Sequence, residues 1–269
     1  VAQHPVWRSE KDNDAFIQEL EANLFDWAEL ITPGFEVHSK RDKMLESVND
    51  EMWSTPAEMA LATEEYVHNY PHVLAGFQGP GIDEVPEIIQ YAKNQGWEIA
   101  NIGMVKHMNA DQATCGYGCS GNPYDAYWSF SPLGHGDLHE LGHGLEKGRF
   151  RFAGWEGHST TNYYSYYSKS RFFQNTGKVS TCQSLDFKGQ FELLQASRTQ
   201  ADPNAYMAAQ NQTGWSWGAR VYIQMMMATQ HEGVLQNGWH LLARLHLIER
   251  EFNRLKSDDA LWNERRLSI

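Results

Sequence analysis

The spacing of apolar residues near the start of the chain predicts helices. Between residues 12 and 31, large apolar side chains recur at intervals of three and four, as they do on one face of a helix. These side chains are Phe16, Ile17, Leu20, Leu24, Trp27 and Leu30. Pro33 and Gly34 then end the segment. A second helix is predicted to begin at Ser54-Thr55-Pro56, where a capping residue precedes proline, and to end at Pro71.

The pattern changes in the middle of the chain. Pro86 begins a third predicted helix, which Gly96 closes. Residues 97–105 form a short apolar stretch bounded by glycine, which is typical of a strand. Residues 108–136 are rich in Gly, Asn, Pro and Ser, and we interpret them as a long ordered loop. The expected elements therefore combine helices with at least one strand.

Helices are expected through most of the remaining chain. We predict one at about 137–147, ended by Gly148, and another at about 157–170. Two more helices, near 214–231 and 235–256, carry apolar stripes at helical spacing. These stripes indicate that both late helices pack against a core.

Composition excludes several classes of protein. Hydrophobic residues make up 41% and aromatic residues 13% of the chain, so intrinsic disorder is not its dominant state. The formal net charge of −12 argues against a nucleic-acid binder, which usually carries a basic face. No apolar run approaches the roughly 18 residues that a transmembrane helix needs. Because the chain begins with Val1 rather than Met, we expect it to be a piece of a longer or processed precursor.

One motif carries recognisable chemistry. His139-Glu140-Leu141-Gly142-His143 is an HExxH sequence within one of the predicted helices. Residues four apart lie on one face of a helix, with Cβ atoms about 5–6 Å apart. His139 and His143 can therefore bind one Zn²⁺. Glu140 lies about 100° around the helix from His139. There its carboxylate can take a proton from a zinc-bound water as that water attacks a carbonyl carbon.

A catalytic zinc needs a third protein ligand and an open fourth position. Two candidates follow the motif, Glu156 and His158. Helical spacing favours His158, because Asn162 lies one turn further on and can hydrogen-bond a ligand. Glu156 lies in the turn before that helix and is the alternative ligand, or a residue that supports one. Glu146, which follows the motif by one turn, is interpreted as a solvated residue at the helix end.

The motif and the segment after it resemble a known family. HELGH followed closely by WEGHSTTNYYSYY is similar to the enhancin-like, mucin-degrading zinc metallopeptidases. Within this family, the segments GHGDLHELGHGLE and FAGWEGHSTTNYYSYY are most similar to the immunomodulating metalloprotease branch. The resemblance is strong over residues 104–167 and weaker over 56–103 and 213–252, and residues 1–55 do not match. It therefore covers the whole of the expected metal site.

The family's pattern keeps both candidates for the third ligand open. It places a Glu on the helix after HExxH, with an Asn four residues later. If that Asn is Asn162, His158 stands at the position of the Glu, whereas spacing alone puts Glu156 there. The resemblance implies that both histidines of the motif bind a single catalytic Zn²⁺ and that Glu140 is the general base.

The resemblance and the predicted elements together imply an α+β, zincin-like fold. A small sheet and the HExxH helix are expected in one lobe, and a mainly helical lobe is expected across the cleft. No linker interrupts the chain. We therefore interpret residues 1–269 as a single catalytic domain excised from a longer protein, with lobes at about 1–148 and about 149–269.

The resemblance implies an endopeptidase that cleaves O-glycosylated, mucin-like proteins, and hence a secreted or cell-surface location. Aromatic faces can stack on sugar rings, and the chain holds 10 Trp and 12 Tyr. We expect the loop at 115–125, with Tyr117 and Tyr124, to form part of the substrate or glycan pocket. Tyr163 is a further candidate for substrate binding, because a tyrosine at this place can donate a hydrogen bond to an oxyanion. The expected partners are O-glycosylated proteins, without nucleic acid and without a membrane span.

Two other functions are compatible with the sequence. The nearer one is a zinc peptidase with ordinary peptide specificity, in which the aromatic loops shape side-chain pockets. Its activity would survive the removal of O-glycans. The other belongs to a different class and is a glycan-binding adhesion module with a vestigial metal site. Such a module would bind glycans without cleaving the protein and without holding zinc.

Overall fold

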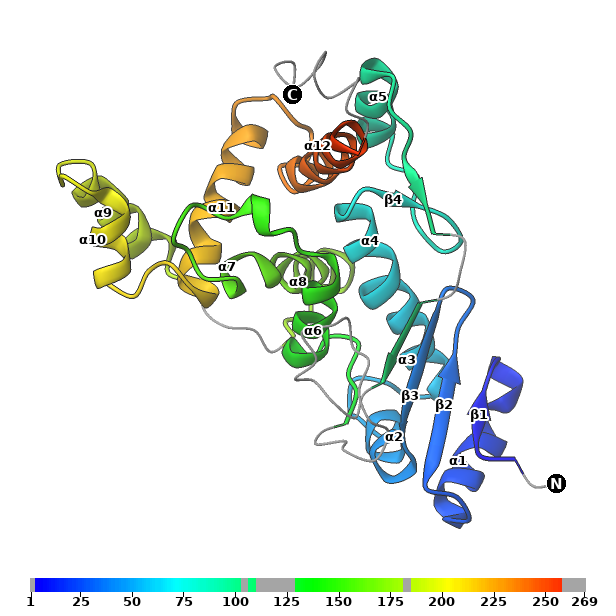
Figure 1. Cartoon of the computed structure of the whole chain (residues 1–269). Helices are drawn as coiled ribbons and strands as arrows, with labels where there is room; N and C mark the ends of the chain where they lie inside the picture. Colours follow the sequence, from blue (N-terminus) through cyan, green and yellow to red (C-terminus); the bar gives the residue numbers. More distant parts are fainter. Residues whose placement is uncertain (1–2, 103–105, 110–128, 181–184, 258–269) are drawn as a thin grey trace.

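The computed structural model describes residues 3–102, 106–109, 129–180 and 185–257 (Figure 1). Helices form most of these residues, and two small sheets account for the strands. In Figure 1 the larger sheet and the N-terminal helices lie at the lower right, and the later helices form the rest of the molecule. None of the helices described is both long enough and apolar enough to cross a membrane.

The larger sheet has four strands in the order β1-β2-β3-β6. These strands are β1 (Val6–Trp7), β2 (Trp27–Ile31), β3 (Phe35–Lys40) and β6 (Lys106–Asn109). The central pair β2–β3 is antiparallel, and each outer strand is parallel to its neighbour. Buried and partly exposed residues alternate along β2 and β3, so one face of the sheet lies on a core. The helices α1 (Asn13–Ala22), α2 (Arg41–Val48) and α3 (Pro56–Ala62) pack nearby.

The single helix expected over residues 12–31 is wrong in its second half. Helix α1 stops at Ala22, and Asn23 adopts the left-handed conformation that ends many helices, with φ 53°. The following residues form β2, in which Ala28 and Leu30 are fully buried. Trp27 and Leu30 stand at helical spacing, but the buried residues of β2, Ala28 and Leu30, are two apart. Pairing with β3 makes this segment a strand.

The second predicted helix begins where expected but continues past Pro71. Thr55 caps α3 by accepting a hydrogen bond from the backbone N–H of Glu58 at 3.2 Å. A π-helical segment, Thr63–Asn69, then leads into α4 (Tyr70–Leu74). Pro71 lies in the first turn of α4, directly after the π-helical segment, so the chain stays helical from Pro56 to Leu74. The proline therefore does not end the helical stretch.

A small second sheet lies beyond α4. Helix α5 (Pro86–Gln95) ends at Gly96 with φ 69°, which confirms the predicted start and stop of this helix. The strand predicted over 97–105 is shorter than expected. Within the described residues it reduces to β5 (Ala100–Asn101), which pairs with β4 (Phe77–Gln78).

Seven α-helices follow residue 129 in the described part of the chain. They are α6 (His135–Leu145), α7 (His158–Thr161), α8 (Tyr163–Thr176), α9 (Phe187–Ser197), α10 (Pro203–Ala209), α11 (Trp215–His231) and α12 (His240–Lys256). The two late helices lie close to where the apolar stripes predict them. The single helix expected at about 157–170 is two helices, which meet at Asn162. Helices α9 and α10, which the sequence analysis does not predict, project from the body at the left of Figure 1.

Helix α8 passes through the largest cluster of buried apolar side chains. Its residues 163–169 are all buried, and they pack against α4, α6, α11 and α12. One side of α6 enters this cluster through Leu145, and another side enters the core of the sheet through Leu138. Helix α6 is therefore held from two sides, which fixes the direction of its remaining face.

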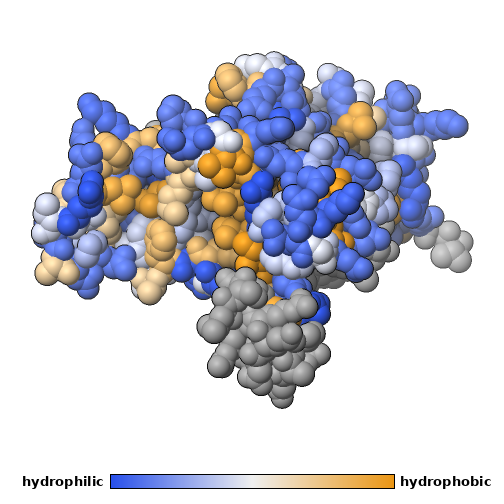
Figure 2. All heavy atoms as spheres, turned by 90° about the horizontal axis from the view of Figure 1, so that it is seen from above, coloured by the Kyte–Doolittle hydropathy of each residue, from blue (hydrophilic) through white to orange (hydrophobic). Residues whose placement is uncertain are grey.

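One face of the molecule carries a band of apolar side chains. Figure 2 shows them as a band across the left and the middle of the face seen from above. Several large apolar side chains of the described residues are more than a third exposed, and five of these lie between residues 187 and 225. These five are Phe187, Phe191, Trp215, Trp217 and Met225. Both tryptophans belong to the first turn of α11, which lies beside the candidate site.

Candidate metal centre

The HExxH residues lie on α6, and two of their side chains face the same way. His139 and His143 are one turn apart, and their ring centroids lie 4.7 Å from each other. His139 is buried, with 6% of its surface exposed, and His143 is partly exposed. The i, i+4 relation predicted from the sequence therefore brings both rings to one place.

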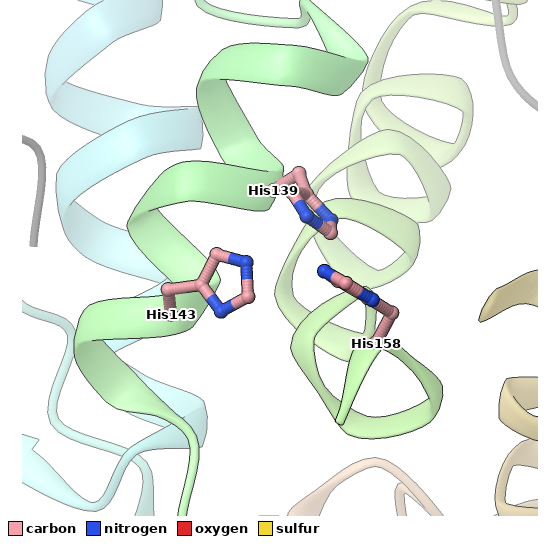
Figure 3. A group of neighbouring side chains, drawn as sticks. All are labelled: His139, His143 and His158. Atoms are coloured by element: carbon pink, nitrogen blue, oxygen red, sulfur yellow. The ribbon is translucent and has the colours of Figure 1, made fainter. Parts of the chain in front are cut away.

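A glycine lets the next helix approach α6 closely. A Cβ atom at Gly142 would overlap the backbone carbonyl oxygen of Thr161 in α7. With only a hydrogen at this position, α7 packs directly on α6 and carries His158 to the other two histidines. The ring of His158 lies 5.1 Å from that of His139 and 5.3 Å from that of His143. Figure 3 shows the three rings turned toward one another.

The cluster of His139, His143 and His158 has the geometry and chemistry of a metal site. One ring nitrogen from each histidine lies within 4.8 Å of the others. A tetrahedral metal bound to nitrogens at about 2.0–2.1 Å needs those atoms about 3.3 Å apart, so small side-chain rotations bring them to one ion. Imidazole nitrogens suit zinc, copper, iron and nickel. The three residues therefore fit the metal that the motif implies.

Burial keeps one of these rings in the form that binds a metal. Burial lowers the pKa of His139 to about 4, and the neighbouring His143 and His158 shift the pKa in the same direction. The imidazole of His139 is therefore neutral at pH 7, with a lone pair available for a metal.

Asn162 holds His139 in place. Its side-chain oxygen lies 2.8 Å from Nδ1 of His139, and its side-chain nitrogen donates to the backbone carbonyl of His158 at 3.0 Å. Asn162 is fully buried at the junction of α7 and α8. It thus ties the helix that carries two of the histidines to the turn that carries the third.

Glu146 supports His143, a contact that the sequence analysis missed. Nδ1 of His143 donates to one carboxylate oxygen of Glu146 at 3.1 Å. The hydroxyls of Thr160 and Thr161 donate to its other oxygen at 3.0 and 2.7 Å. The interpretation of Glu146 as a solvated residue is therefore wrong. The i, i+3 spacing between His143 and Glu146 could have indicated their contact. The contacts with Thr160 and Thr161 could not be predicted, because these residues belong to another helix.

The two candidates for the third ligand take different positions. Glu156 is an exposed residue, and its carboxylate accepts a hydrogen bond from Nδ1 of His158. Its backbone N–H donates to the carbonyl of Thr213 at 3.2 Å. Among the described residues, His158 is the one that joins the pair from α6, and Glu156 contacts the imidazole of His158.

The other predicted site residues are less closely gathered. Glu140 is partly buried on α6, next to His139. Tyr163 is only 2% exposed, and its ring packs 5.6 Å from that of Tyr222 in the core. Burial raises the pKa of Tyr163 well above its usual value. This burial argues against the substrate contact expected of Tyr163. Tyr117 and Tyr124 lie outside the described residues.

Removing the carboxylate of Glu146 is expected to weaken metal binding about 10- to 100-fold, because His143 then loses the group that orients its ring. The Glu146→Gln variant keeps one oxygen acceptor and should lose less affinity than Glu146→Ala. Competition with a coloured chelator measures both affinities. Glu192 of α9, which is exposed and 4.0 Å from Lys188, supplies a control for general effects of removing a carboxylate. Equal affinities of Glu146→Ala and Glu192→Ala would contradict the assignment.

No family model matches the sequence. Among curated proteins, the chain is similar to the immunomodulating metalloprotease of Pseudomonas aeruginosa, with 32% identity over 197 residues. The matched region is 71% of this chain and 21% of the relative, so the chain spans about a fifth of that protein's length.

Comparison with solved structures shows the same similarity. The chain is similar to the IMPa metallopeptidase from Pseudomonas aeruginosa, with TM-score 0.73, and to that metallopeptidase in complex with T-antigen, with TM-score 0.74; each has 26% identity. A structure of IMPa in complex with an O-glycopeptide has TM-score 0.74 and 25% identity. Each match covers 99% of this chain and 32% of the solved chain. The fold is therefore the α+β, zincin-like one expected from the sequence, and the chain is a relative of the immunomodulating metalloprotease.

Proposed function

We propose that the chain is a zinc-dependent endopeptidase that cleaves O-glycosylated proteins. The observation that carries this proposal is the convergence of His139, His143 and His158 beside the glutamate of an HExxH helix. The relatives support it, because they are named as a metalloprotease and a metallopeptidase. As the chain spans only part of these proteins, its own activity needs a direct test.

The three imidazoles would hold one Zn²⁺. Asn162 fixes the ring of His139, Glu146 fixes that of His143, and Glu156 contacts that of His158. Each of these contacts uses the Nδ1 atom. The Nε2 atoms are left for the metal, an arrangement common among histidine ligands. When bound, zinc supplies a Lewis acid that polarises a carbonyl group and lowers the pKa of water.

Glu140 is the proposed general base. As the oxygen of water bonds to the carbonyl carbon of the scissile peptide, the carboxylate of Glu140 takes a proton from that water. It then gives the proton to the leaving nitrogen when the C–N bond breaks. The residue ends the cycle ionised, as it began. One water is consumed; its second proton leaves the new carboxyl group for the amine, so the products are a carboxylate and a protonated amine.

The substrate class comes from the relatives. One solved relative is in complex with T-antigen and another with an O-glycopeptide. We extend this recognition of an O-linked glycan to the present chain, with Tyr117 and Tyr124 as proposed contacts. Such a substrate implies a secreted or cell-surface location.

The substrate claim is tested with a mucin-domain protein before and after enzymatic removal of its O-glycans. We expect cleavage of the glycosylated protein and none of the deglycosylated one, with zinc at about one ion per chain. Cleavage of both forms would retain the peptidase mechanism and overturn the substrate class. Binding of the glycoprotein by a zinc-free chain, without cleavage, would instead favour an adhesion module.

A further inference from the structure

Trp215 contacts two of the three clustered histidines through ring stacking. Its indole ring lies 4.1 Å from the ring of His158, with an angle of 12° between the planes. It also lies 5.3 Å from the ring of His139, at an angle of 11°. Stacked rings touch through their faces, whereas the ring nitrogens of an imidazole lie in its plane. Trp215 therefore restrains the orientation of these rings without competing for the atoms that bind a metal.

The backbone of Trp215 adopts a conformation that a bulky residue rarely has. Its φ is +46°, within the left-handed region, at the first residue of α11. Such outliers persist only where the surrounding structure enforces them, and they gather at active sites and ligand clamps. Here the enforcing contacts lie on both sides of the tryptophan along the chain, at residues 213, 214 and 218.

These contacts join α11 to the turn that carries His158. The carbonyl of Thr213 accepts the backbone N–H of Glu156, and a Cβ atom at Gly214 would overlap the carboxylate of the same residue. A Cβ atom at Gly218 would overlap the side chain of Ser159. Glycines at both positions allow the first turn of α11 to lie directly on α7. The approach places Trp215 over His158.

His158 needs such support more than the other two histidines do. His139 and His143 lie within α6, which two cores hold in place. His158 begins α7, which spans only His158–Thr161, and its side-chain partner Glu156 is exposed. Without a second contact, the ring of His158 would rotate with little cost.

We propose that Trp215 is a positioning residue of the metal centre, which holds the imidazole of His158 in the orientation that metal binding requires. This inference rests on the proposed function, because it takes the three histidines to be the ligands. The neighbouring Trp217 provides a matched comparison. It is also about half exposed on α11, but its ring lies 4.4 Å from the guanidinium of Arg220.

The test compares the zinc affinities of the wild type, Trp215→Ala, Trp215→Phe and Trp217→Ala by competition with a coloured chelator. Stacked aromatic pairs contribute modestly, so Trp215→Ala should bind zinc about two- to tenfold more weakly. Trp215→Phe keeps a flat ring and should fall between this variant and the wild type. Trp217→Ala should match the wild type. Circular dichroism checks that each variant is folded.

A second readout is independent of activity. Added Co²⁺ should quench part of the tryptophan fluorescence of the wild type. This quenching should be reduced in Trp215→Phe and retained in Trp217→Phe. Equal zinc affinities of Trp215→Ala and the wild type would overturn the positioning role. Quenching in Trp215→Phe equal to that in the wild type would overturn it as well. A wild type that binds zinc and cleaves no glycoprotein would overturn the proposed function alone, and a wild type that binds no zinc would overturn both.

Discussion

Replacing Glu140 with glutamine is expected to remove nearly all peptide-bond cleavage while leaving the metal in place. A positioned general base contributes about 10²- to 10⁴-fold to such a reaction, and glutamine has a similar shape but cannot take the proton. The side chain is not one of the three clustered donors, so zinc content should stay near that of the wild type. Initial rates on an O-glycosylated protein, together with metal analysis, measure both quantities.

The control for Glu140→Gln is Glu192→Gln, which makes the same chemical change on the exposed surface of α9. It should keep the wild-type rate. Activity of Glu140→Gln within a few fold of the wild type would exclude Glu140 as the base. Loss of zinc from this variant would indicate that the glutamate serves the metal rather than the proton transfer.

Replacing His158 with alanine is expected to remove the bound metal and with it the activity. Zinc should fall from about one ion per chain toward none, because only two protein donors would remain where a catalytic site needs three. Glu156→Ala should keep the metal with affinity lowered about 10- to 100-fold, as expected when a residue behind a ligand is lost. Metal analysis after dialysis separates the two outcomes.

His231 offers a control for the loss of a histidine, because it lies exposed at the end of α11 and outside the cluster. His231→Ala should keep both zinc and activity. If Glu156→Ala loses its zinc while His158→Ala retains it, the carboxylate is the third ligand, as the spacing of the motif alone allows.

Features encoded by short spacings were predictable from the sequence. The i, i+4 relation that places His139 and His143 on one face of a helix depends only on the local backbone. The boundaries of α5 follow from Pro86 and Gly96 for the same reason. The segment 12–31 shows the limit, because its apolar residues keep helical spacing to Leu30, although pairing with β3 makes residues 27–31 a strand.

Contacts between distant segments were not predictable. Glu146 reaches threonines on α7, and Trp215 reaches histidines that lie on α6 and α7. The periodicity of a single sequence carries no information about such contacts between helices. Burial is equally hidden: the run of tyrosines after His158 gives no sign that Tyr163 turns into the core. A tyrosine becomes a candidate for substrate contact only if the packing of its helix leaves it accessible.

Helix α7 approaches α6 so closely at Gly142 that a substitution at this position would also disturb the metal site. Any side chain here would push α7 away from α6, because the obstacle is the backbone oxygen of Thr161 rather than a flexible group. The same displacement would carry His158 away from the pair on α6. A single added methyl group would thus displace one of the three proposed ligands, although it touches none of them. Replacing helical glycine with alanine stabilises many proteins. At Gly142, in the middle of α6, this replacement therefore cannot be used.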